Sequence, residues 1–142
     1  MKFVFNDGGR DAAGYKGLTG DCVTRAIAIV SEKSYQEVYD KINEFSKFEK
    51  TGKRKKGKSS ARTGVYKQTI RKVMEDYGFK WIPTMFVGSG CKVHLKSDEL
   101  PSGRILVSLS KHSAAVVDGV LNDTYDCSRD ESRCVYGYFI KE

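Results

Sequence analysis

The stretch from Thr19 to Val30, TGDCVTRAIAIV, decides how the first half of this chain folds. Its apolar side chains recur at intervals of three and four residues, the spacing of one helix face. Gly20 breaks the chain before this helix, and Asp21 is a residue type that caps helix N-termini. The pattern therefore predicts a buried helix that begins at Cys22. A thiol at that position lies at the positive end of the helix dipole, which lowers its pKa and favours the nucleophilic thiolate.

Length and composition restrict the class of protein. The 142 residues are 39% hydrophobic and 30% charged, which suits one globular domain with a substantial core. No apolar run approaches the roughly 20 residues of a membrane span, and the first six residues are too few for the apolar region of a signal peptide. We therefore expect a single domain over residues 1–142 that acts in the cytoplasm. In that compartment the four cysteines, Cys22, Cys91, Cys127 and Cys134, are expected to be reduced.

The net charge of +7 comes from one segment of the chain. Residues 47–62 hold eight Lys or Arg residues and a single acid, so the rest of the chain is neutral overall. Because the segment is polar and rich in Gly and Lys, we predict a flexible basic loop at about 49–63. It is either a solvated loop or a contact for nucleic-acid phosphates or an acidic protein partner. The residues that would make such a contact are Lys53, Arg54, Lys55, Lys56 and Lys58.

Helical patterns fill the first half of the chain and extended patterns fill the second. Ser34 and Glu37 form a capping box ahead of a second amphipathic helix, and a third helix stops at Gly78. Strands are expected at residues 3–5, 79–82, 104–109, 112–117, 120–125 and 135–140. Asp118-Gly119 forms a tight hairpin turn between two of them. Helices followed by an antiparallel sheet indicate an α+β fold.

The two-residue turn also decides which side chains of the hairpin are neighbours. His112 then faces Tyr125, and because side chains alternate between the two faces, His112 and Asp123 lie on the same face. We predict that Asp123 holds the imidazole in one tautomer while the other ring nitrogen takes the proton of Cys22. Cys22, His112 and Asp123 would then be nucleophile, base and orienting acid.

These features resemble the papain-like cysteine peptidases, above all small bacterial and phage members such as those that process bacteriocin leader peptides. The resemblance rests on Gly20-Asp21-Cys22 at a helix start, on KHSAAVVDG at residues 111–119, and on Asp123-Thr124-Tyr125. The last matches an Asn/Asp-x-Trp pattern in which an aromatic ring, here that of Tyr125, shields the histidine–acid pair.

The resemblance implies a papain-like fold in which the nucleophile helix packs on a C-terminal antiparallel sheet. It implies a peptidase or isopeptidase that acts on a protein or peptide without a metal or other cofactor and away from membranes, in the host cytoplasm if the chain is encoded by a phage. Such peptidases usually carry a Gln a few residues before the cysteine as an oxyanion-hole donor. None lies between Met1 and Cys22, so Thr19 and the backbone N–H of Cys22 are the candidates here.

Two alternatives use other residues. One is a catalytically inactive module that binds nucleic acid or an acidic protein through the basic loop. The other is a zinc site, because Cys91 and His94 have a tolerable ligand spacing, whereas Cys127 and Cys134 are further apart than usual. Without a metal, Cys127 and Cys134 would be core or surface thiols that pair only on oxidation.

Replacement of the five basic loop residues with Ser tests the partner hypothesis. We expect the melting temperature to change little, because a solvated loop contributes little to folding. If the loop binds nucleic acid, the replacement abolishes binding, and the affinity of the wild type falls steeply with salt. A wild-type protein that shows no salt-dependent binding would leave the segment as a linker.

Overall fold

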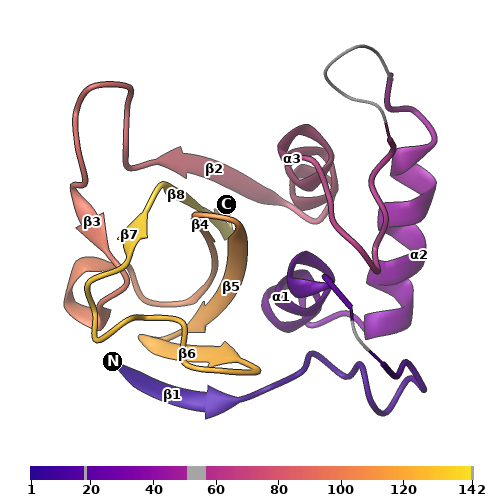
Figure 1. Ribbon diagram of the computed structural model, residues 1–142, viewed down its shortest axis with the longest axis horizontal. Helices are drawn as coiled ribbons and strands as arrows, with labels where there is room; N and C mark the ends of the chain where they lie inside the picture. Colours follow the sequence, from indigo (N-terminus) through magenta and orange to yellow (C-terminus); the bar gives the residue numbers. More distant parts are fainter. Residues whose placement is uncertain (18, 51–56, 142) are drawn as a thin grey trace.

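The computed structural model describes residues 1–17, 19–50 and 57–141 (Figure 1). In this part of the chain, three helices cover one face of a six-stranded sheet, and a two-stranded ribbon packs on the other face (Figure 1). The helices are α1 (Cys22–Ser31), α2 (Tyr35–Ser46) and α3 (Lys67–Asp76). The strands are β1 (Lys2–Phe5), β2 (Phe79–Pro83), β3 (Val93–His94), β4 (Arg104–Leu109), β5 (His112–Val117), β6 (Val120–Asp123), β7 (Cys134–Val135) and β8 (Gly137–Lys141). The architecture is α+β, and within the described ranges no helix has the length and apolarity to cross a membrane.

The sheet order is β1-β6-β5-β4-β8-β2, and the ribbon pairs β3 with β7. All neighbours in the sheet run antiparallel except β1 and β6, which run parallel. The predicted C-terminal antiparallel sheet is therefore present in β2, β4, β5, β6 and β8, but the N-terminal β1 makes the whole sheet mixed. The expected N-terminal strand does form, but it completes the sheet by pairing with the outer edge of β6, and no local pattern specifies that choice of partner.

The central hairpin has the predicted register, with Val117 opposite Val120 and Ala115 opposite Asn122. Asp118 and Gly119 both have positive φ angles, 47° and 79°, as a tight hairpin turn of this hand requires. Strand β6 ends at Asp123, earlier than predicted. The segment predicted as one strand at 135–140 is split, because Val135 pairs with β3 whereas Gly137 begins the pairing with β2 and β4.

Alternation along the sheet separates two cores. Leu106 of β4 and Ala115 of β5 face the helices, where they pack against Ile27 and other side chains of α1, α2 and α3. Ile105 and Val116 face the ribbon. Both cores consist of buried side chains. Helix α1 is buried along almost its whole length and packs against α2 and β5. The packing of α1 on β5 therefore sets where the first residue of α1 lies relative to the first residue of β5.

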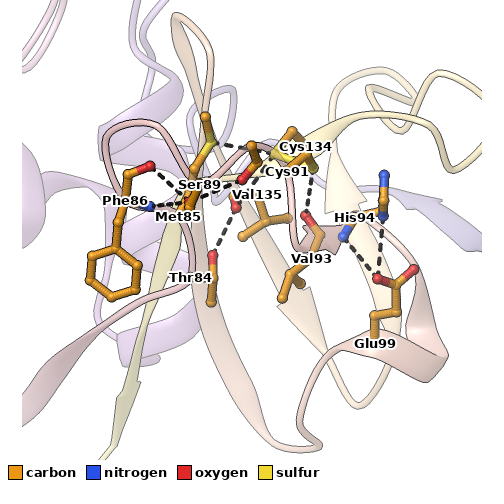
Figure 2. The surroundings of a disulfide bond; sticks show 11 residues. Thr84, Met85, Phe86, Ser89, Cys91, Val93, His94, Glu99, Cys134 and Val135 are labelled. Carbon is orange, nitrogen blue, oxygen red and sulfur yellow. Dashed lines mark hydrogen bonds and ion pairs between the residues drawn. A yellow bond between two sulfur atoms is a disulfide. The ribbon is translucent and has the colours of Figure 1, made fainter.

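A disulfide joins Cys91 to Cys134 and ties the segment after β2 to the ribbon (Figure 2). The expectation of four reduced cysteines is therefore wrong, and so is the pairing of Cys127 with Cys134, because the free cysteines are Cys22 and Cys127. The proposed zinc ligands are also engaged, since Cys91 is in the disulfide and His94 Nδ1 lies 3.3 Å from Glu99 Oε1 (Figure 2). In the ribbon Cys134 lies opposite His94, and Cys91, which precedes β3, is bonded to Cys134 across a separation of 43 residues in sequence.

The predicted basic loop is packed at its ends. Ala61 is fully buried, its N–H donates to Asn43 Oδ1 and its carbonyl accepts from the Thr24 hydroxyl. Ser59 is also buried and donates from its backbone N–H to Glu49. Flexibility is therefore not a property of the whole segment at 49–63. Of the basic candidates, Lys58 is exposed and donates to the carbonyl of Lys47, whereas Lys53, Arg54, Lys55 and Lys56 lie outside the described residues.

Gly137 shows how tightly β8 and β2 are packed. A Cβ at this position would lie 2.3 Å from Cη2 of Trp81 and 2.9 Å from the carbonyl oxygen of Ile82. We expect Gly137→Ala to lower the free energy of unfolding by roughly 1–3 kcal/mol, as overpacking does. Gly57→Ala is the control, because nothing lies within 4 Å of its added Cβ. Urea denaturation of both variants measures the difference, and equal stabilities would contradict this packing.

Candidate active site

A cleft of about 530 Å³ opens where the start of α1, the start of α3 and the turn between β4 and β5 meet. Cys22 lies on one wall and His112 on another, so the structure brings together residues that are 90 positions apart in sequence. The polar and charged residues that line the cleft are Thr19, Asp21, Cys22, Arg25, Thr63, Lys67, Ser108, Lys111, His112, Ser113 and Tyr125.

Cys22 begins α1, as predicted, and its thiol is a free, partly buried group. Burial alone raises the pKa of this thiol. A hydrogen bond from His112, the backbone N–H of Ser113, and the positive charges of His112 and Arg25 outweigh burial and lower the pKa below its ordinary value. The environment thus favours the thiolate, the form that attacks electrophiles.

His112 joins Cys22 to Asp123. Its Nε2 lies 2.6 Å from Asp123 Oδ2, which leaves Nδ1 for the hydrogen bond with Cys22. Burial lowers the pKa of His112, but hydrogen bonds with Asp123, Cys127 and Cys22 raise it well above its ordinary value. Burial alone raises the pKa of Asp123. The hydrogen bond and charge of His112 and the Thr124 N–H outweigh burial and lower the pKa below its ordinary value, so the carboxylate stays charged. The predicted contact of Asp123 with His112 is therefore present.

Arg25 is the residue that the sequence analysis missed. It is 8% exposed, forms an ion pair with Asp21, and its Nη2 lies 3.6 Å from Asp123 Oδ1. A buried guanidinium thus links the N-terminus of α1 to the end of β6. The spacing of four residues between Asp21 and Arg25 could have predicted their ion pair, because oppositely charged residues at this spacing are neighbours on a helix.

Asp21 occupies the N-cap position of α1, but its side chain makes no capping hydrogen bond. It instead accepts from Tyr35 Oη at 2.6 Å and from Thr19 Oγ1 at 2.7 Å, besides its ion pair with Arg25. Predicted side-chain capping by Asp21 is therefore wrong, because buried charged partners compete for the carboxylate. Thr19 Oγ1 donates its proton to Asp21, so the backbone N–H of Cys22 at the start of α1 is the remaining oxyanion-hole candidate.

Cys127 lies close to the imidazole, is 1% exposed, and acts on the pKa values of both His112 and Asp123. The ligand-type atoms of these three residues all lie within 4.8 Å of one another. However, the 2.6 Å between His112 Nε2 and Asp123 Oδ2 is a hydrogen-bond distance. Two ligands of a tetrahedral zinc ion at about 2.0–2.2 Å would be separated by about 3.4 Å. The arrangement fits a shared proton better than a metal ion.

Tyr125 covers part of the histidine. The centroid of its ring lies 5.4 Å from that of His112, with the planes tilted by 43°, although the side chain is 51% exposed. Tyr125 follows the end of β6, so this contact comes from the chain folding back over the site. The predicted proximity of Tyr125 to the histidine is present, and it leaves the cleft open on the side of Cys22.

The Asp21 network predicts a specific acid sensitivity. Burial raises the pKa of Asp21, but hydrogen bonds from Tyr35 and Thr19 and the charges of Arg25 and Arg10 hold it below 3.8. The unfolded chain therefore binds the proton first as pH falls, so this carboxylate stabilises the fold above about pH 4 and loses its contribution below that. We expect Asp21→Asn to lower stability at pH 7 by roughly 3 kcal/mol or more, because it leaves Arg25 only partly compensated.

Urea denaturation between pH 3 and pH 7 measures this effect. The variant should also lose less stability on acidification than the wild type does. Glu75→Gln is the matched control, because Glu75 forms an ion pair with Arg71 on the surface, where both side chains are more than half exposed. A parallel acid response of Asp21→Asn and wild type would contradict the assignment.

Comparison of the chain with protein-family models, curated proteins and solved structures finds no significant match to any of them.

Proposed function

We propose that this chain is a cysteine-dependent hydrolase that cleaves peptide or isopeptide bonds. The observation that carries the proposal is that Cys22 and His112 line one open cleft, with the His112 Nε2 hydrogen-bonded to the buried Asp123 carboxylate at 2.6 Å. A nucleophile, a base and an acid that orients the base are the groups that covalent acyl transfer needs. The lowered pKa of the thiol and the raised pKa of the imidazole favour a thiolate–imidazolium pair at neutral pH.

In the proposed reaction, the Cys22 thiolate attacks the carbonyl carbon of the substrate, and a C–S bond forms. The oxyanion that results lies at the N-terminus of α1, where the Cys22 N–H and the helix dipole favour negative charge. His112 then gives its proton to the leaving amine as the C–N bond breaks, which leaves a thioester on Cys22. Water attacks the thioester while His112 takes its proton, the C–S bond breaks, and the acid product leaves as the Cys22 thiolate and the His112 imidazolium are restored.

Asp123 and its neighbours would hold the imidazole in place through this cycle. Asp123 is 3% exposed and charged, so it stabilises the imidazolium without taking its proton. Arg25 in turn holds Asp123 from the other side. A cytoplasmic setting would keep the Cys22 thiol free, but it would also reduce the Cys91–Cys134 disulfide, so the fold with that bond formed fits a less reducing compartment than the cytoplasm. Amide substrates other than peptides, such as glutamine side chains, are a less favoured class.

The pH dependence of alkylation tests the proposal. Cys22 should react with iodoacetamide at pH 6, well below the ordinary thiol pKa of about 8.5, because its thiolate persists there. His112→Ala removes the hydrogen bond and the positive charge, so labelling of Cys22 at pH 6 should slow roughly tenfold or more. Asp123→Ala should act in the same direction with a smaller effect. Mass spectrometry of alkylated peptides between pH 5 and pH 9 measures the rates.

Internal controls come from the chain itself. Cys127 is free but buried and should label slowly, and His94→Ala should leave Cys22 unchanged, because His94 pairs with Glu99 and does not line the cleft. Cys22→Ser should remove acyl-transfer activity while the protein stays folded. If Cys22 titrates as an ordinary thiol and is indifferent to His112→Ala, the hydrolase proposal fails.

A further inference from the structure

A second hollow adjoins the cleft that holds Cys22. This pocket, of about 230 Å³, lies between α3 and the sheet. Its apolar lining consists of Trp81, Leu106, Phe139 and Ile70. Lys67, Ile70, Ser108 and Ser113 line both hollows, so a ligand in the cleft has direct access to the apolar pocket. We call this second hollow the Trp81 pocket.

The Trp81 pocket is shaped by packing. The ring of Trp81 lies 4.9 Å from that of Phe139, and Gly137 leaves the space that the indole occupies. Phe139 and Leu106 are buried core residues, so the wall that they form is part of the folded core. An open apolar pocket with such walls suits one large aliphatic or aromatic side chain, which gains free energy by leaving water.

The free charges around these hollows are positive. Lys67 at the start of α3 and Lys111 in the turn between β4 and β5 both line the cleft, and both are exposed. Across the described ranges neither lysine has an ion pair or a side-chain hydrogen bond. Asp21, the one acid in the lining, is buried against Arg25 and contributes no net negative charge. The cleft therefore attracts negative charge.

We propose that the substrate is an acidic polypeptide segment in which a large apolar residue is adjacent to an acidic residue. This inference rests on the proposed function, because it assigns the groups that flank the bond presented to Cys22. The apolar side chain enters the Trp81 pocket, and the neighbouring carboxylate pairs with Lys67, which lies at the junction of the two hollows. Lys111 on the opposite wall favours further negative charge along the same segment.

Alkylation by peptidyl chloromethyl ketones tests this substrate class. The reagents carry Gly at the reactive end, preceded in either order by Leu or Ala and by Glu or Gln. The thiolate displaces chloride, and mass spectrometry measures the rate at Cys22. In one of the two residue orders, we expect the reagent with both Leu and Glu to react about tenfold faster than the reagent in which Gln replaces Glu or Ala replaces Leu. The preference for Glu should weaken as salt rises, because exposed charges are screened.

Two pairs of variants separate the two contacts. Lys67→Gln should abolish the preference for Glu and keep that for Leu, whereas Lys72→Gln, on the same helix but outside both hollows, should keep both. Gln68 is exposed and lines only the Trp81 pocket, so Gln68→Phe should block the pocket and remove the preference for Leu. Gln68→Ala should leave it open.

Iodoacetamide distinguishes a failure of this inference from a failure of the proposed function. If iodoacetamide labels Cys22 rapidly at pH 6 but the peptidyl reagents show no preference for Leu or Glu, the substrate class is overturned while the hydrolase stands. If Cys22 is slow toward iodoacetamide as well, both proposals fall. Preferences that persist in Lys67→Gln and Gln68→Phe would place the contacts elsewhere.

Discussion

The buried guanidinium of Arg25 is the interaction on which the arrangement of the site depends. It forms an ion pair with Asp21 at the start of α1 and lies 3.6 Å from Asp123 at the end of β6. Charges removed from water are tolerated only when they are paired, so the three residues stabilise the fold as a set. Because Asp21 directly precedes Cys22 and Asp123 contacts His112, the same set aligns the thiol with the imidazole.

The position of the site also follows from the way in which the helices meet the sheet. Helix α1 packs on β5, and the core on this face of the sheet includes small side chains from both, Ala26 and Ala28 on the helix and Ala115 on the strand. Small residues permit close approach of the two backbones. Cys22 at the start of α1 and His112 at the start of β5 therefore lie on the walls of one cleft that is open to solvent. A core that is packed to high density cannot easily change this distance.

The two sides of the His112 imidazole differ, because one side is buried and the other faces the open cleft. Behind it, Cys127 and Asp123 are buried and hydrogen-bonded, which keeps the ring oriented. In front of it, the cleft is open and is lined by Lys67 and Lys111, which have no ion pair within the part of the chain that the structure describes. The disulfide between Cys91 and Cys134 lies away from this region and stabilises the ribbon on the other face of the sheet (Figure 2). The cysteines that link the ribbon and the free cysteine that lines the cleft are thus different residues.

By itself, the sequence determined the features that depend on short separations. The apolar period of residues 23–30 placed Cys22 at the start of a helix, and the Asp118-Gly119 turn placed Asp123 beside His112. Both follow from fixed local geometry, 3.6 residues per helical turn and side-chain alternation in a strand. These rules apply without any knowledge of the rest of the fold.

Only the tertiary structure decided what distant segments do to one another. The parallel pairing of β1 with β6, the disulfide between Cys91 and Cys134, and the approach of Cys127 to His112 each join residues whose separation in sequence carries no geometric rule. The same holds for Asp21, whose expected capping bond gave way to partners brought in by folding. A buried polar group forms hydrogen bonds with the partners that lie near it, and the packing of the whole chain determines which partners those are.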